Sequence, residues 1–328
     1  MKNKYAIGID IGGTETKFGV IRYIGNDKFV LEKKWSIKTI CGQNNVEKMI
    51  DLIVEQIKGN NIEVCGIAVA ALLDFYNGHI IYAPNLMWEH IPLKKLFKKK
   101  LGLQVVIDND ANLATLGIYY TKIKTKYPNV QNMICFTLGT GVGGGIIYKN
   151  ELLHGKTFSA VELGHMTVEP EGELCGCGNK GCLERYIGAR WFINNIVKEL
   201  KYKKIKTCLY KIVNNKLLDL TPKIIYDAAK QNDKYSLEKW KVYGKYLGIA
   251  IGNLINIFAP EVVVLTGGVA NAYEFFLPYA KQEVRNRVWP IIKDDKHPLL
   301  QNMKYEIVAG QHYGVIGAGI LAIKTFLL

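Results

Sequence analysis

One pattern occurs twice in this sequence, and it restricts the possible folds more than any other feature. IGIDIGGTETKFGVI at 7–21 and CFTLGTGVGGGIIY at 135–148 each read as a strand, a Gly/Thr turn and a returning strand. The second copy follows the first by roughly 130 residues. An internal duplication of this kind predicts two similar lobes, each built around its own hairpin.

Strands and helices alternate along the rest of the chain. The fully apolar run at 64–73 is typical of a strand in a sheet covered on both faces. We expect further strands at 29–39, 104–108, 261–265 and 305–309, with a loop from Asn77 to Trp88. We expect helices at 46–57, 93–101, 109–120, 188–200, 223–231, 235–258, 272–287 and 314–326. This order predicts an α/β fold with mixed sheets.

The length and composition are those of a globular intracellular protein. With 328 residues the chain can form two domains with sizeable cores. It opens directly on an apolar strand, and no apolar run approaches the ~20 residues of a membrane span. Four scattered cysteines read as reduced thiols: Cys41, Cys65, Cys135 and Cys208. We therefore expect a cytoplasmic protein that does not enter a membrane.

The net charge of +14 raises the question of nucleic-acid binding. The lysines are spread along the chain, however, and the densest run, LKKLFKKKL at 93–101, alternates with apolar residues. That alternation predicts a helix with one buried face and one solvated basic face. Nucleic acid is therefore not an expected partner.

A histidine and three cysteines lie within eighteen residues, in ELGHMTVEPEGELCGCGNKGCLE at 162–184. The four residues are His165, Cys175, Cys177 and Cys182. Thiolates and an imidazole are the ligands of structural zinc, and the intervening glycines allow the backbone to fold tightly around one ion. The spacing is not that of a zinc finger, and a redox cysteine cluster is the alternative.

Two glutamates flank this cluster, Glu162 before His165 and Glu184 after Cys182. A metal that fixed the loop would also fix both carboxylates, which are good acceptors for the hydroxyls of a polyol. The alternative for either residue is an ordinary solvated charge on the surface.

The two Gly/Thr turns indicate phosphate binding. Small residues there let backbone N–H groups point outward together, and a threonine hydroxyl adds a donor. The turn residues are Gly12, Gly13 and Thr14 in the first copy and Gly139, Thr140 and Gly141 in the second. Gly267 and Gly268 form a third glycine pair after a strand. No Walker-type or Rossmann glycine pattern is present.

Two charged residues lie close to the first turn. Asp10, at the end of the first strand, is placed to hold Mg²⁺ through water. Lys17 is a candidate phosphate contact, and an exposed strand lysine is its alternative role.

Together these motifs resemble the ROK (repressor, open reading frame, kinase) family of sugar kinases. The resemblance covers the whole chain through DIGGTETK, PNLMW, NDAN, LGTGVGGG, the cysteine stretch and LTGG. It implies an actin-like ATPase fold of the ribonuclease H-like type, with two lobes and a cleft between them. We expect one lobe at 1–113 plus 312–328 and the other at 114–311.

The resemblance also implies roles for individual residues. Asp110 would be the general base for the sugar hydroxyl, although a helix N-cap is its alternative role. The implied sugar contacts are Asn85, Asn109, Glu162, His165 and Glu184. His165 would touch both the sugar and a zinc ion shared with Cys175, Cys177 and Cys182. ATP with Mg²⁺ would use Asp10, Lys17, both turns and the pair Gly267 and Gly268.

The expected reaction is transfer of a phosphoryl group from ATP to the 6-hydroxyl of a hexose, most often glucose, by a homodimer. Ala70, Ala71 and Val161 depart from the family pattern near the implied sugar pocket, which keeps N-acetylmannosamine, allose and β-glucosides as alternative substrates. A sugar-responsive repressor is a further alternative. It is disfavoured because the first phosphate strand begins within four residues of the start, where repressors carry a DNA-binding domain. A catalytically silent sugar-binding protein is disfavoured by Asp110 and the two turns.

Overall fold

The computed structural model describes residues 4–156, 161–289, 301–310 and 312–328. The strands are β1 (Lys4–Ile11), β2 (Glu15–Tyr23), β3 (Phe29–Lys38), β4 (Val64–Val69), β5 (Leu72–Asp74), β6 (His79–Ala83), β7 (Trp88–Ile91), β8 (Gln104–Asn109), β9 (Met133–Leu138), β10 (Val142–Tyr148), β11 (Glu151–Leu152), β12 (Val262–Thr266) and β13 (Lys304–Val308). The helices are α1 (Val46–Ile57), α2 (Leu93–Leu101), α3 (Asp110–Ile118), α4 (Lys124–Lys126), α5 (Glu184–Ile187), α6 (Ala189–Tyr202), α7 (Leu209–Ile212), α8 (Pro222–Lys230), α9 (Lys234–Phe258), α10 (Tyr273–Arg287) and α12 (Tyr313–Phe326).

The contacts divide the chain into two compact units. The first unit contains Met1–Gln131, Gly145–Val161 and Gln311–Leu328, and the second contains Asn132–Gly144 and Glu162–Gly310. The expected lobe boundary at residue 113 falls inside α3, whose residues pack on α12 and stay with the first unit. One unit boundary falls within β10, after Gly144.

The two main sheets repeat one topology, so the predicted duplication is confirmed. One sheet has the order β3-β2-β1-β4-β8, and the other has the order β11-β10-β9-β12-β13. In the first, β1 pairs with β2 in antiparallel fashion and with β4 in parallel fashion. In the second, β9 follows the same plan, with β10 on one side and β12 parallel to it on the other. This is the mixed α/β architecture of the actin-like ATPase fold.

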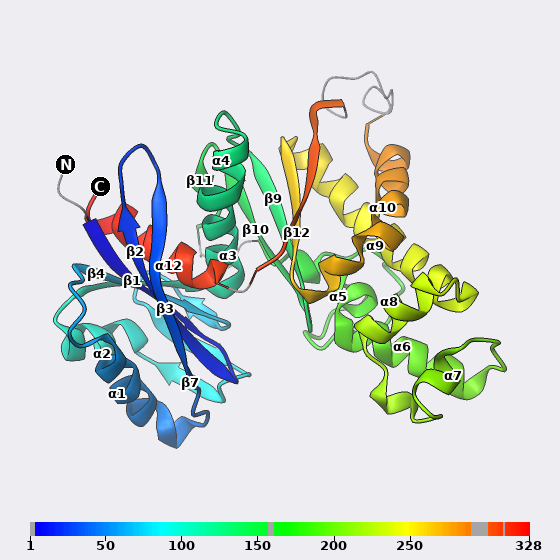
Figure 1. Ribbon diagram of the computed structural model, residues 1–328, viewed down its shortest axis with the longest axis horizontal. Coiled ribbons are helices and arrows are strands. Elements are labelled where there is room, and N and C mark those ends of the chain that lie inside the picture. Colours follow the sequence, from blue (N-terminus) through cyan, green and yellow to red (C-terminus); the bar gives the residue numbers. More distant parts are fainter. Residues whose placement is uncertain (1–3, 157–160, 290–300, 311) are drawn as a thin grey trace. The chain divides into compact units, whose positions relative to one another are not determined.

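Helix α12 closes the first unit by packing directly against its sheet (Figure 1). The approach is close enough that a Cβ atom at Gly66 of β4 would stand 1.9 Å from the carbonyl oxygen of Ala318. On another side, a Cβ at Gly317 would stand 1.7 Å from the carbonyl oxygen of Leu113 in α3. Glycine is therefore required at both positions, and α3 is held rigidly at the end of β8.

Helices α9 and α10 pack against each other along most of their length in the second unit. The side chain of Asp233 caps α9 by accepting a hydrogen bond from the backbone N–H of Ser236. Between the helices and α6, four aromatic rings form one buried cluster: Phe192, Trp240, Tyr243 and Phe276. These contacts fix the helices that follow the cysteine loop.

Two of the predicted elements around residues 64–88 were wrong. The strand expected at 64–73 ends at Val69, because its neighbours β1 and β8 pair with it only that far. The segment expected to be a loop contains the strand β6, and β7 begins at its last residue, Trp88; both join β5 in a three-stranded sheet. Gly78, with φ +60°, lies in the turn between β5 and β6. These strands are too short for their alternation to stand out in the sequence.

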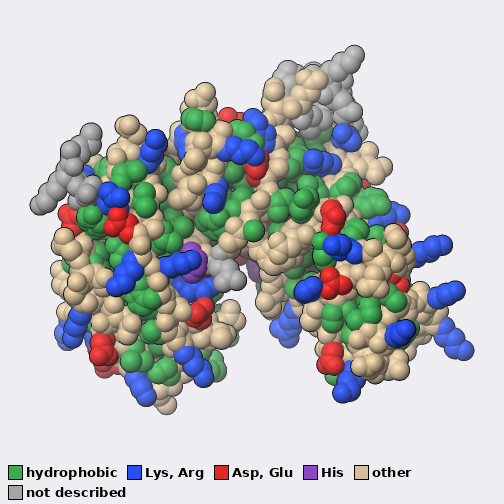
Figure 2. Space-filling model, in the orientation of Figure 1, with side chains coloured by type: hydrophobic (Ala, Val, Ile, Leu, Met, Phe, Trp, Pro, Cys, Tyr) green, Lys and Arg blue, Asp and Glu red, His purple; other side chains and the backbone are tan. Residues whose placement is uncertain are grey.

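On the face shown in Figure 2, the basic residues do not gather into one patch. Lys and Arg side chains are scattered over the face shown in Figure 2, interspersed with acidic and apolar groups. In α2, Leu93 and Phe97 are buried while the lysines face outward or lie partly exposed, as the amphipathic pattern predicted. Among the described residues, no helix is long and apolar enough to span a membrane.

Candidate functional site

The first Gly/Thr turn joins β1 to β2 and is closed by a hydrogen bond from the Gly12 N–H to the Glu15 carbonyl, 3.2 Å long. A Cβ atom at Gly13 would stand 2.7 Å from the carbonyl oxygen of Asn85, so the turn lies against the PNLMW segment. Thr14 is exposed at the tip. The Cys41 thiol donates to the Gly13 carbonyl at 3.0 Å and also lies 3.6 Å from the Asn85 carbonyl oxygen, so it contacts both segments.

Asp10 lies at the end of β1, directly opposite Lys17 in the register of β1 with β2. Burial, and after it the negative charge of Asp110, raise the pKa of Asp10 from 3.8 to about 6, against the opposing effect of Lys17. A carboxyl group with this environment gains from a bound cation, because the cation compensates the buried negative charge. The Lys17 ammonium also lies 3.9 Å from a Glu15 carboxylate oxygen, and its side chain is 23% exposed.

Asn109 and Asp110 form the junction between β8 and α3. The side chain of Asn109 caps the helix, since its Oδ1 accepts from the N–H groups of Ala111 and Asn112 at 2.8 and 3.4 Å. The N-cap role considered for Asp110 was therefore wrong, because Asp110 is already the first helical residue. Its Oδ1 accepts from the N–H of Ala111 at 2.9 Å.

The second Gly/Thr turn joins β9 to β10 and is held by the segment that follows the cysteine loop. The N–H groups of Ala189 and Arg190, at the start of α6, donate to the carbonyls of Gly139 and Thr140 at 3.0 and 3.2 Å. Glu184 contributes its carboxylate, which accepts from the Val142 N–H at 2.9 Å. Gly141 is needed beside it, because a Cβ there would stand 2.3 Å from Glu184 Oε2.

Glu162 directly precedes a short 3-10 helix at Leu163–His165, and His165 is the last residue of that helix. Glu162 is exposed, and His165 is partly buried with its Nδ1 directed toward the cysteines. Val161, immediately before them, has φ +72°. A β-branched residue in this region is a genuine outlier, so the backbone leading into Glu162 is strained.

The cysteine loop brings its four predicted ligands together. The ligand atoms of His165, Cys175, Cys177 and Cys182 all lie within 4.8 Å of one another. The Sγ atoms of Cys177 and Cys182 are 3.6 Å apart, and Cys175 Sγ is 3.9 Å from His165 Nδ1. Four ligands on a tetrahedron with Zn–S bonds of about 2.3 Å have separations of this size. The residues therefore fit a structural zinc ion.

The backbone of the loop is shaped for this convergence. The Cys175 N–H donates to the Asn179 carbonyl at 2.7 Å, and the Leu183 N–H donates to the Met166 carbonyl at 2.9 Å. Gly181 has φ +70°, and a Cβ there would stand 1.7 Å from the Glu169 carbonyl oxygen, so only glycine fits. The loop is thus folded tightly by its own hydrogen bonds.

The thiols of the cluster influence one another. Burial, together with the neighbouring thiols of Cys177 and Cys175, raises the pKa of Cys182 to about 12. For Cys177, burial acts in the same direction, but hydrogen bonds from the Asn179 backbone and the Cys182 side chain lower its pKa overall. Adjacent thiols resist holding several negative charges, and a divalent cation removes that conflict by binding them as thiolates.

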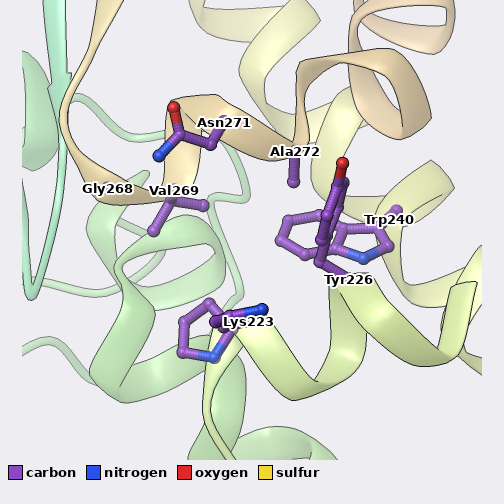
Figure 3. Close-up of a pocket in the computed structure, with 8 residues that line it drawn as sticks. Lys223, Tyr226, Trp240, Gly268, Val269, Asn271 and Ala272 are labelled. Atoms are coloured by element: carbon purple, nitrogen blue, oxygen red, sulfur yellow. The ribbon is translucent and has the colours of Figure 1, made fainter. Parts of the chain in front are cut away.

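Gly267 and Gly268 follow β12 and lead into a pocket of the second unit (Figure 3). The pocket has a volume of about 270 Å³, slightly below the usual range for small-molecule sites. Its walls come from α8, α9 and the segment after β12, and its lining residues are Pro222, Lys223, Tyr226, Trp240, Gly268, Val269, Asn271 and Ala272. Tyr226 is held by a hydrogen bond from its hydroxyl to Glu274 at 2.8 Å.

The predicted site residues fall into two groups. Asp10, the first turn, Asn85, Asn109 and Asp110 belong to the first unit, whereas Glu162, the cysteine loop, Glu184, the second turn and Gly267 and Gly268 belong to the second. Sequence reasoning missed the pocket residues Lys223, Tyr226 and Trp240, which lie on helices far from any glycine motif. It also missed Asp108, a buried carboxylate beside Asn109, although an acidic residue at the end of an apolar strand was a usable signal.

Comparison with known proteins identifies the same family at each step. The ROK family model matches residues 6–325. A glucokinase from Halalkalibacterium halodurans is 33% identical, and the alignment covers 98% of this chain and 96% of that enzyme. A xylose repressor from Bacillus spizizenii is 28% identical over 99% of this chain and 79% of the repressor.

The fold comparison agrees. The structure of a ROK family glucokinase from Streptomyces griseus, in complex with glucose and AMPPNP, superposes with a TM-score of 0.73 at 28% identity. The match covers 98% of this chain and 99% of that one. With the duplicated sheets, the paired Gly/Thr turns and the cysteine loop, these matches show that the chain belongs to the ROK family.

Proposed function

We propose that this protein is an ATP-dependent hexose kinase that transfers the γ-phosphoryl group of ATP to the 6-hydroxyl of a hexose, with glucose as the best-supported substrate. The glucokinase from Halalkalibacterium halodurans aligns over nearly the full length of both chains. The glucokinase from Streptomyces griseus was solved with glucose and a nucleotide analogue. Both relatives support the reaction class and the sugar.

The observation that carries the proposal is the pair of carboxyl groups on β1 and α3. Asp110 is the first residue of α3, and its negative charge helps to raise the pKa of Asp10 at the end of β1. In the proposed reaction Asp110 accepts the proton of the attacking hydroxyl, which is the role a carboxylate fills in phosphoryl transfer to an alcohol. Asp10 would hold Mg²⁺, which when bound neutralises charge on the phosphates.

The phosphates of ATP are the proposed ligands of the two Gly/Thr turns. The support is their composition, Gly12, Gly13 and Thr14 in one and Gly139, Thr140 and Gly141 in the other, and the matching place of each turn between the first two strands of its sheet. The pocket beside Gly268 is the proposed site of the nucleoside, because its lining combines the ring of Tyr226 with the polar groups of Lys223 and Asn271 and includes the fully buried Trp240.

The cysteine loop is the proposed zinc site. The ion would be held by His165, Cys175, Cys177 and Cys182. A bound zinc ion would make the loop rigid and would take no part in phosphoryl transfer. The loop's two ends carry Glu162 and Glu184, so a rigid loop would fix the carboxylates that we assign to the sugar hydroxyls. His165 uses Nδ1 toward the cluster, which leaves Nε2 for a sugar hydroxyl.

The choice of sugar rests on hydrogen bonding. Asn85, Asn109, Glu162, His165 and Glu184 are polar groups suited to the hydroxyls of an unmodified pyranose, and analogues that leave such groups unpaired are rejected strongly. Ala70, Ala71 and the 52% exposed Leu72 add apolar surface to the first unit, which keeps N-acetylmannosamine, allose and β-glucosides as alternatives.

An ADP-release assay coupled to a second enzyme, run across a panel of hexoses, tests the proposal. We expect the highest kcat/KM with glucose. A clear preference for N-acetylmannosamine would overturn the glucose assignment and leave the kinase intact. Absence of ADP release with every sugar, together with measurable sugar binding, would overturn the kinase itself.

The similarity to xylose repressors makes sugar-responsive DNA binding the second candidate function. It is supported by 28% identity over 99% of this chain to the repressor from Bacillus spizizenii. A gel-shift assay with and without xylose or glucose tests it.

A homodimer and a cytoplasmic location stay predictions. Sedimentation of the purified protein tests whether it is a homodimer.

A further inference from the structure

Asp108 is a buried carboxylate at the end of β8, and its side chain is only 3% exposed. Both of its oxygens are bonded. Oδ1 accepts from the backbone N–H of Asn109 at 2.6 Å and from Nδ2 of Asn112 at 3.1 Å. Oδ2 is paired with Nε2 of His154 at 2.6 Å. Three donors compensate the cost of burying this carboxylate, whereas losing a donor leaves one of its oxygens undersatisfied.

These bonds enclose the residues that carry the proposed chemistry. Asp108 bonds forward to Asn112, and Asn109 and Asp110 lie between the two. The Asn109 side chain in turn caps the same helix turn. The orientation of Asp110 is therefore set by a strand-to-helix junction whose geometry depends on the Asp108 carboxylate.

His154 reaches this junction from a different part of the first unit. It follows β11, and its ring packs against the ring of Phe75, which follows β5, with centroids 5.1 Å apart. Because an ionised carboxylate can only accept, the imidazole Nε2–H donates to Asp108. One hydrogen bond thus ties the segment after β11 to the end of β8.

We propose that Asp108 and His154 are positioning residues for phosphoryl transfer: their hydrogen bond fixes the Asn109–Asp110 junction and thereby the placement of the general base. This inference rests on the proposed role of Asp110. Displacement of a catalytic group by about 1 Å can lower a rate by about 100-fold, so the pair acts on the chemical step. The binding of ATP, which depends on the turns and the pocket, is unaffected.

Two substitutions of His154 test the hydrogen bond itself. In His154→Gln the amide nitrogen reaches the place of Nε2 and can still donate to Asp108, whereas in His154→Asn the amide is too short. We expect single-turnover phosphoryl transfer to fall by up to about 100-fold in His154→Asn and to return to within a few fold of wild type in His154→Gln. The KM for ATP should stay within about twofold in both variants, since neither substitution changes a group proposed to bind ATP.

Asp108→Asn is the partner variant. The amide nitrogen that replaces one oxygen must face either the donors of Asn109 and Asn112 or the imidazole, which has to change tautomer to accept from it. The original bonds are lost in either arrangement, so the chemical step should slow as in His154→Asn. In the double variant Asp108→Asn/His154→Asn the reductions in the rate of phosphoryl transfer should not add. The reason is that the two single variants and the double variant all lack the same hydrogen bond between residues 108 and 154.

Tyr119→Phe is the matched control for stability. The Tyr119 hydroxyl bonds the Val130 carbonyl at 2.8 Å and Asn150 Oδ1 at 2.7 Å within the same unit, and its side chain is buried. We expect it to lower the melting temperature without slowing phosphoryl transfer. The inference is overturned if His154→Asn behaves like this control, or if His154→Gln is as slow as His154→Asn.

The same experiments separate this inference from the proposed function. If Asp110→Asn retains wild-type turnover, the general-base assignment fails and the positioning role fails with it. If Asp110→Asn is inactive but His154→Asn and Asp108→Asn transfer phosphate at the wild-type rate, only the positioning role fails.

Discussion

The carboxylate of Glu184 accepts a hydrogen bond from the backbone N–H of Val142, with 2.9 Å between Oε2 and N. Glu184 stands two residues after Cys182, and Val142 directly follows the second Gly/Thr turn. The end of the cysteine loop is therefore joined to the turn proposed to bind phosphate. Any change that loosens the loop reaches that turn through this bond.

Glu184→Ala removes the bond to Val142 as well as the proposed sugar contact. We expect the KM for ATP and the KM for the hexose to rise together, each by about tenfold, since a hydrogen bond to a charged group contributes about 1.5–3 kcal/mol. Glu184→Gln still accepts from Val142 and should keep the KM for ATP. Initial-rate kinetics check this, with the exposed Glu171→Ala as control. An unchanged KM for ATP in Glu184→Ala would contradict the coupling.

Asp110→Asn should keep the fold and the affinity for sugar while lowering kcat by about 10²–10⁴, the usual loss for a general base. Sugar affinity is measured by calorimetry and turnover by ADP release. Asp51→Asn is the control, since Asp51 is an exposed carboxylate of α1 paired with Lys100. Turnover at the wild-type level in Asp110→Asn would remove this residue from the mechanism.

Metal analysis of the purified protein should find one zinc ion per chain. Cys177→Ser should lose the metal and the activity together, because the loop that presents Glu162 and Glu184 is then no longer fixed. Cys208→Ser, which alters a thiol outside the cluster, should retain both. Full activity in a protein shown to contain no metal would contradict the zinc assignment.

In the absence of Mg²⁺, the free energy of unfolding should depend on pH through Asp10. Its pKa is about 6 in the folded chain and 3.8 in the unfolded one, so the folded chain binds the proton more tightly. Its contribution is therefore fully present below about pH 4 and is lost as the pH rises through about 6. Urea unfolding of wild type and Asp10→Asn at several pH values measures this. A difference between the two that stays constant from pH 4 to 7 would contradict it.

Val161→Gly should stabilise the protein by about 1 kcal/mol. A β-branched residue at φ +72° carries strain of about 1–3 kcal/mol, and glycine removes it at an entropic cost of about 0.5–1 kcal/mol. Thermal unfolding should show a midpoint raised by a few degrees. Val168→Gly in the same region, where φ is not positive, should lower the midpoint. A lower midpoint in Val161→Gly would show that the conformation is not strained.

The sequence by itself determined the elements whose periodicity is long or repeated. The duplicated hairpins, the buried α12 and the long α9 could be predicted because each segment's apolar spacing fixes which face is buried. The convergence of His165 and the three cysteines could also be predicted, since their clustering in the chain already brings the four side chains near each other. Asn109 and Asp110 followed from a short motif at a strand end.

Only the tertiary structure decided which distant residues meet. The short strands β6 and β7 exist because β5 and its neighbours supply partners, not because their own pattern demands it. The bonds of Glu184 to Val142 and of Asp108 to His154 join residues 42 and 46 positions apart. Such pairs depend on how whole elements pack, and no local pattern of residue types encodes that packing.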